Sequence, residues 1–194
     1  MFKTNTLGGW IVPAVTTIPN ETKIPDFSEF GDDCTIGDDC KIGNHCKIGD
    51  GCKIGNYCKI GNYCKIGNAC TIGNHCKIGN GCKIGSGCTI GNYCTIGNYC
   101  TIGDDCTIGD ACTIGNYCKI GNGCTWLGVK IKSWITLANV DGSGRQIKVV
   151  KSVEGEIRIE AGCFIGTSDE FIAKATQEGK LRYVSIVNAI AEHV

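Results

Sequence analysis

Cysteine returns every six residues over most of this chain without a single slip. Sixteen cysteines keep this step from Cys34 to Cys124, and fifteen isoleucines keep it from Ile36 to Ile120. A glycine follows each of these isoleucines, and Asn or Asp follows the glycine, with one Ser at position 86. A fixed period decides the architecture, because each repeat must stack on its neighbours to bury its apolar side.

Each six-residue unit reads as a short strand followed by a corner. Polar and apolar positions alternate over residues 93–96, which is the period of a strand. A helix would scatter a six-residue period around its circumference. The next two residues, Gly97 and Asn98, both tolerate positive φ. We therefore expect this pair to supply the sharp bend.

The residue before each cysteine indicates how many sides close one turn. At steps of eighteen, small residues gather in one column, and the aromatic residues fall in the other two. Three sides per eighteen-residue coil explain this grouping, whereas a two-sided coil would mix the columns. Column 1 is Asp33, Gly51, Ala69, Gly87, Asp105 and Gly123; column 2 is Asp39, Tyr57, His75, Tyr93 and Ala111; column 3 is His45, Tyr63, Gly81, Tyr99 and Tyr117.

The unit Cys-(Lys/Thr)-Ile-Gly-(Asn/Asp)-x resembles the hexapeptide-repeat family over more than half of the chain. The resemblance implies a left-handed parallel β-helix of triangular section, with Ile and Cys inside. The register also extends beyond the cysteines, through Val12, Ile18, Ile24 and Phe30 at one end and Trp126 at the other. We expect a mainly β protein: an N-terminal cap over residues 1–11, the β-helix over 12–126 and an α+β domain over 127–194.

Seventeen cysteines in 194 residues would ordinarily suggest a secreted disulfide scaffold. Their spacing favours a different role, as small, polarizable core fillers in the inward slot. Parallel, in-register side chains do not reach the torsion of a disulfide ladder. Zinc and iron–sulfur sites use local clusters such as C-x-x-C, which the sequence lacks. We expect reduced thiols, no metal and a cytoplasmic location.

The charge balance argues against two classes of partner. Lysine plus arginine equals aspartate plus glutamate, 19 each, so no net charge holds the chain on bulk DNA or an anionic membrane. We expect no membrane association and no sequence-specific nucleic acid. Residues 7–15, LGGWIVPAV, resemble the core of a signal peptide, but this stretch contains Pro13 and overlaps the repeat register. We therefore expect no cleaved leader.

The residue after each cysteine points outward, and the face that follows column 1 (face 1) carries mostly threonine. Such a flat, nearly uncharged surface suits packing against another subunit, and hexapeptide-repeat proteins commonly form parallel trimers. A regular threonine array also resembles ice-binding β-helices, although Lys53 interrupts it. We expect a homotrimer through the face of Thr71, Thr89 and Thr107.

Face 2, after column 2, and face 3, after column 3, begin with stacks of lysine beside tyrosine and histidine. Like charges one coil apart repel, and lysine with interleaved aromatics is suited to an anionic ligand. The competing interpretation is a solvated face, neutralised by corner aspartates such as Asp38 and Asp50. The candidate ligand-binding residues are Lys41, Lys59, Lys77, Lys47, Lys65, Lys83, Tyr57 and Tyr63.

The family resemblance implies two activities, acyl transfer with a histidine base and zinc-dependent carbonic anhydrase. His45 and His75 are the candidate catalytic residues, but each takes the place of a tyrosine in its column. No insertion between Gly31 and Gly121 would build a cleft for a substrate. We expect a non-catalytic structural or binding scaffold without a cofactor. An acetyl-coenzyme A-dependent acyltransferase and a binding protein for a small anionic ligand are the alternatives.

The segment after Trp126 has a different pattern. It predicts strands over residues 131–137, 146–153 and 156–160, with a turn at Asp141-Gly142-Ser143-Gly144. A capping box from Thr167 to Glu170 opens a helix that Gly179 ends. A second helix follows from the spacing of Tyr183, Ile186, Val187 and Ile190.

Part of this segment resembles a small domain of uncharacterised bacterial and prophage-encoded proteins. The resemblance implies a bacterial or phage origin but no chemistry. Cys163 has no histidine near it in the sequence, so we expect it to be buried packing rather than a nucleophile. The matching residues are Trp134-Ile135-Thr136, Gly162-Cys163-Phe164-Ile165-Gly166-Thr167 and Asp169-Glu170-Phe171, with Ser168 where leucine is common.

Overall fold

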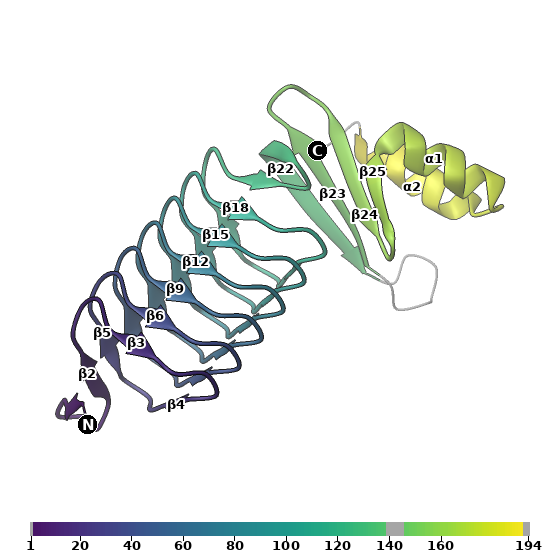
Figure 1. The fold of residues 1–194 in the computed structure, drawn as a ribbon. Coiled ribbons are helices and arrows are strands. Elements are labelled where there is room, and N and C mark those ends of the chain that lie inside the picture. Colours follow the sequence, from purple (N-terminus) through teal and green to yellow (C-terminus); the bar gives the residue numbers. More distant parts are fainter. Residues whose placement is uncertain (1, 139–145, 192–194) are drawn as a thin grey trace. The chain divides into compact units, whose positions relative to one another are not determined.

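The computed structural model describes residues 2–138 and 146–191 (Figure 1). The chain divides into two compact units, Met1–Cys124 (unit 1) and Thr125–Val194 (unit 2). The turn expected at Asp141-Gly142-Ser143-Gly144 lies outside the described residues.

Unit 1 is a β-solenoid whose short strands stack coil upon coil (Figure 1). Strand residues of the coils pair in parallel with the residues eighteen positions away, as Ile60 does with Ile42 and Ile78. The predicted three-sided coil of eighteen residues is confirmed. Face 1 is β3 (Thr17–Ile18), β6 (Thr35–Ile36), β9 (Lys53–Ile54), β12 (Thr71–Ile72), β15 (Thr89–Ile90) and β18 (Thr107–Ile108); face 2 is β4 (Lys23–Ile24), β7 (Lys41–Ile42), β10 (Lys59–Ile60), β13 (Lys77–Ile78), β16 (Thr95–Ile96) and β19 (Thr113–Ile114); face 3 is β2 (Trp10–Val12), β5 (Glu29–Phe30), β8 (Lys47–Ile48), β11 (Lys65–Ile66), β14 (Lys83–Ile84), β17 (Thr101–Ile102) and β20 (Lys119–Ile120).

The positive φ of each corner falls on the residue before the cysteine, as at Tyr93 (φ 58°) and Tyr99 (φ 59°). Gly97 does not have a positive φ, so the prediction that the Gly97-Asn98 pair supplies it was wrong. Glycine is needed there for a different reason, because a Cβ on Gly97 would lie 2.5 Å from Oδ1 of Asn80 in the preceding coil. That oxygen accepts a hydrogen bond from the backbone N–H of Asn98 at 2.8 Å.

The same arrangement continues along each corner of the solenoid. The backbone N–H of Asn80 donates to Oδ1 of Asn62 at 2.7 Å, and that of Asn62 donates to Oδ1 of Asn44 at 2.8 Å. Each side chain therefore provides an acceptor for a corner amide of the next coil, so that the amide does not depend on water. The Gly-Asn pair is a device for stacking coils rather than a device for bending them.

The interior consists of the isoleucine and cysteine rows, as predicted, and Cys94 and Ile96 are each 1% exposed. Each thiol donates to the carbonyl of a corner residue 21 positions earlier, as Cys94 Sγ does to the Gly73 oxygen at 3.2 Å and Cys100 Sγ does to Gly79 at 3.2 Å. Cysteine thus fills the small slot and also hydrogen-bonds a corner carbonyl that the strand ladder does not use.

All 17 cysteines are free thiols, and those of the solenoid are buried except for Cys118, which is half-buried. Burial raises the pKa of the thiols of Cys34, Cys40 and Cys124 above the ordinary value, because a thiolate loses its hydration in the interior. These three thiols are therefore held in the protonated, unreactive form.

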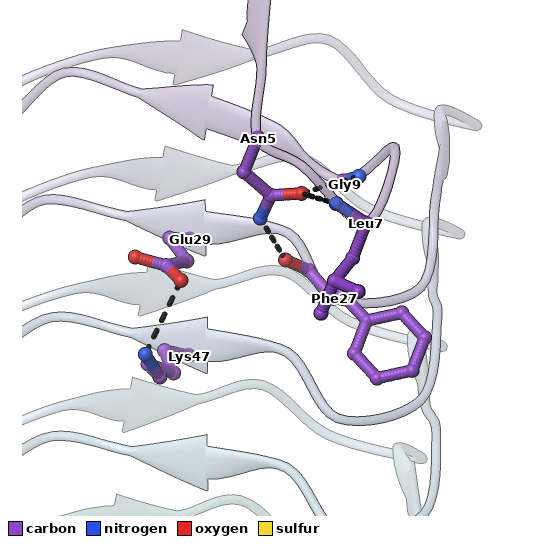
Figure 2. A network of polar contacts seen from close by, with 6 residues as sticks. All are labelled: Asn5, Leu7, Gly9, Phe27, Glu29 and Lys47. Atoms are coloured by element: carbon purple, nitrogen blue, oxygen red, sulfur yellow. Dashed lines mark hydrogen bonds and ion pairs between the residues drawn. The ribbon is translucent and has the colours of Figure 1, made fainter.

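The N-terminal residues add one antiparallel strand to the sheet of face 3. Strand β1 (Lys3–Thr4) pairs antiparallel with β2, and β2 pairs in parallel with β5. Asn5 fastens this hairpin (Figure 2): its Oδ1 accepts from the amides of Leu7 and Gly9, both at 3.0 Å, and its Nδ2 donates to the carbonyl of Phe27 at 2.8 Å. One side chain thus closes the turn and attaches it to the first coil.

Unit 2 is an antiparallel sheet with two helices on one face. The strands follow in the order β21 (Thr125–Trp126), β22 (Val129–Ala138), β23 (Gln146–Ser152), β24 (Ile157–Ala161) and β25 (Phe164–Thr167). The helices are α1 (Ser168–Gln177) and α2 (Leu181–Ala191), and their core with the sheet includes Ile147, Ile159, Phe171 and Val187. The three expected strands and both helices are present, whereas β25 was missed.

The predicted boundaries of the first helix are confirmed. The Thr167 amide donates to Glu170 Oε2 at 2.8 Å, and the Glu170 amide donates to Thr167 Oγ1 at 3.3 Å, which completes the capping box. Gly179, with φ 68°, follows the C-cap residue Glu178.

We expect one thiol per native chain to react rapidly with Ellman's reagent, because Cys163 is exposed and the solenoid thiols are not. Cys163→Ser should remove this rapid phase, and denaturant should release the remaining thiols. Rapid reaction of several thiols in the native protein would contradict the packing of the core. The raised pKa values of Cys34, Cys40 and Cys124 give their contribution to stability a definite sign. The unfolded chain loses these three protons first, so the part of the free energy of unfolding that they contribute should fall above the ordinary thiol pKa of about 8.5.

Candidate functional site

The structure places the candidate lysines in two separate, in-register stacks. Lys59 lies opposite Lys41 and Lys77 on face 2. On face 3, Lys65 lies opposite Lys47 and Lys83 in the same way. All six side chains are exposed.

The face 2 stack has one further member, which the candidate residues did not include. Lys23 of β4 pairs with Lys41 one coil further on. It precedes the first cysteine of the repeat, but its step of eighteen from Lys41 could have identified it. The stack therefore begins in the first coils.

Acidic residues are absent from the middle coils, although the whole chain is neutral. Between Asp50 and Asp104 the sequence contains five lysines and no aspartate or glutamate. We call residues 51–103 the basic belt. Strands on all three faces contribute to it, so it surrounds the solenoid. The belt lysines are Lys53, Lys59, Lys65, Lys77 and Lys83.

The corner aspartates do not pair with the lysine stacks. Asp38 Oδ1 accepts from the Asn56 amide, and Asp50 Oδ1 accepts from the Asn68 amide, each at 2.6 Å. Within the described part of unit 1, the one ion pair joins Lys47 to Glu29 at 3.2 Å (Figure 2). Lys59 and Lys77 therefore repel each other at the spacing of neighbouring strands, about 4.8 Å, and Lys65 and Lys83 do the same on face 3. An anion on the belt would relieve this repulsion.

Columns 2 and 3 form stacked aromatic ladders, as expected for the histidines. The His75 ring lies 4.9 Å from both Tyr57 and Tyr93, with interplanar angles of 5°. The His45 ring lies 5.1 Å from Phe27 and 5.3 Å from Tyr63. Because neighbouring rings cover each other's faces, a base could stack only at the end of a ladder. This geometry does not favour the repeated base stacking that single-stranded nucleic acids use.

Face 2 brings most of the candidate residues together. Each of its strands follows a column 2 corner and precedes a column 3 corner, so aromatic side chains border its lysine stack on both edges. Around Lys59 these neighbours are Tyr57 and Tyr63, and the adjoining corner residues Asn56 and Asn62 are uncharged. Lys47, Lys65 and Lys83 lie on face 3 and are not part of this group.

The two histidines are not arranged as catalytic partners. His45 and His75 belong to ladders on opposite edges of face 2, and each ring is stacked between two aromatic rings. A general base needs a positioning partner and a bound substrate within hydrogen-bond reach. Among the described residues, no three His, Cys, Asp or Glu side chains are placed to hold a metal ion.

Cys163 is exposed, so the expectation that it is buried was wrong. It follows Gly162, whose φ of 63° marks the tight turn between β24 and β25. Within residues 2–138 and 146–191, neither α1 nor α2 is long and apolar enough to cross a membrane.

Eighteen-residue coils, inward Ile and Cys rows and three flat faces define a β-solenoid of the hexapeptide type. The family described as bacterial transferase hexapeptide (six repeats) matches residues 16–50, 33–68, 45–76, 69–104 and 93–125, which is more than half of the chain. The chain belongs to this family. No curated protein and no solved structure matches it. The matches end at residue 125, so the resemblance of the C-terminal segment to prophage-encoded proteins has no support from them.

Proposed function

We propose that the chain is a non-catalytic binding scaffold whose basic belt captures a small multivalent anion. One observation carries the proposal: five lysines and no carboxylate occupy residues 51–103, on coils that no loop interrupts. A rigid, flat surface with uncompensated positive charge attracts anions and requires no reorganisation to bind them. A bacterial or phage origin and a reducing, cytoplasmic setting for the free thiols belong to the same proposal.

Face 2 is the part of the belt best suited to this role. Lys59 and Lys77 are adjacent in register, and the ladder Tyr57–His75–Tyr93 lies on the same edge of both strands. Tyrosine hydroxyls can donate to an anion, and lysine contributes a mobile point charge. The acyltransferase alternative finds no comparable support, since both histidines are engaged in the ladders.

Tripolyphosphate is a suitable probe, and we expect it to bind with an affinity that falls as salt concentration rises. Lys59→Glu should weaken binding about fivefold or more, the effect of one or two lost charge contacts. Lys119→Glu is the matched control, because Lys119 is equally exposed on β20 but lies outside the belt. Isothermal titration calorimetry distinguishes the two variants. Equal losses in both, or no dependence on salt, would refute a localised site.

We also propose that the scaffold is a parallel homotrimer that assembles through face 1. Thr89 lies in register with Thr71 and Thr107, and all three side chains are exposed. Ala69 and Gly87 of column 1 border this surface, so that backbones of two subunits could approach closely. Such an arrangement leaves face 2 open to the anion.

Thr89→Arg should convert the trimer to a monomer, because it places a large charge at the centre of face 1. Thr95→Arg is the matched control on face 2, and it should leave the trimer intact. Light scattering coupled to gel filtration gives the mass, and circular dichroism checks that the coils remain folded. A monomeric wild-type protein at micromolar concentration would exclude the trimer.

A further inference from the structure

A cavity of about 440 Å³ opens in unit 2, where the turn between β24 and β25 meets the two helices. Ile147, Phe171, Ala175 and Tyr183 line it, and all four also belong to the buried core of the unit. The cavity therefore reaches the core. Its volume lies within the range of small-molecule sites, about 300–1,000 Å³.

The charged groups of the cavity lie on the helical side of its lining. Lys180 Nζ forms an ion pair with Glu178 Oε2 at 2.6 Å, so these two charges offset each other. Lys174 Nζ lies 5.7 Å from the centre of the Phe164 ring. No carboxylate of the described residues lies within ion-pair distance of Lys174. Two lysines and one carboxylate thus give the lining one net positive charge beside an apolar chamber.

We propose that this cavity binds a small apolar carboxylate, with its hydrocarbon part against Ile147 and Phe171 and its carboxylate against Lys174. Burial of the hydrocarbon part supplies most of the binding free energy, and the single ammonium selects the charged end. Glu178 disfavours a phosphate, because a second negative charge on the ligand would meet this carboxylate without a further free cation. This site is independent of the basic belt, which lies in unit 1.

Cys163 gives a direct readout of occupancy. It lines the cavity, and it is the one exposed cysteine of the 17. A ligand in the cavity should shield its thiol from alkylation, whereas the buried solenoid thiols contribute no rapid background. The protein then needs no label or added reporter.

The test measures the rate of Cys163 alkylation by iodoacetamide in the full chain, with decanoate as the probe. Decanoate should slow the reaction about fivefold or more, and decylamine, which has the same chain but a positive charge, should not. Lys174→Glu should abolish protection by decanoate because it places a like charge beside the carboxylate, and Lys174→Met should weaken the protection because the apolar contacts remain. Lys174 is exposed, so neither variant should disturb folding. Lys132→Glu is the matched control on β22, outside the cavity, and it should retain protection.

Three results would overturn the proposal: no protection by decanoate, equal protection by decylamine, or protection that survives in both Lys174 variants. Circular dichroism of each variant shows that the fold is retained. Loss of tripolyphosphate binding by the belt would leave these outcomes unchanged, so the two proposals can fail separately.

Discussion

Close contact between successive coils at the glycine corners is the constraint on which the solenoid depends. A Cβ at Gly97 would collide with the Asn80 side chain and with the backbone of Gly79, at 2.5 and 2.7 Å. The space left by the missing Cβ is filled by the preceding coil's asparagine, whose Oδ1 accepts from the next corner amide. Glycine and asparagine are therefore needed as a pair, one coil apart. Their strict recurrence keeps the coils identical in length.

Because the coils repeat, the inward residues stay the same while the outward residues vary. From Cys34 onward the isoleucine and cysteine rows and the thiol-to-carbonyl bonds repeat in the same form, whether the outward residue is Lys59 or Thr95. The outward positions can consequently change without cost to the core. This freedom allows acidic coils at the ends and a basic belt between them, and it gives the three faces different characters on one framework.

The sequence alone predicts what the six-residue period controls. Grouping at steps of eighteen predicted the three faces and the aromatic ladders, because translation along the solenoid repeats the same environment. The repeat did not reveal which corner residue has a positive φ. Tyr93 and Tyr99 adopt it, although glycine is the residue that ordinarily does. The exposure of Cys163 and the cavity beside it were also beyond reach, because both depend on how non-repeating elements of unit 2 pack together.

The most direct test of the corner constraint compares two glycine substitutions in urea titrations. Gly97→Ala places a Cβ against the preceding coil, so it should lower the free energy of unfolding by about 2–3 kcal/mol. Gly87 has a φ of +66° but open space around it, so Gly87→Ala should cost only the conformational strain, about 1 kcal/mol. A larger loss in the free energy of unfolding for Gly87→Ala than for Gly97→Ala would show that glycine is required for the bend of the corner rather than for contact between coils. That result would contradict the account.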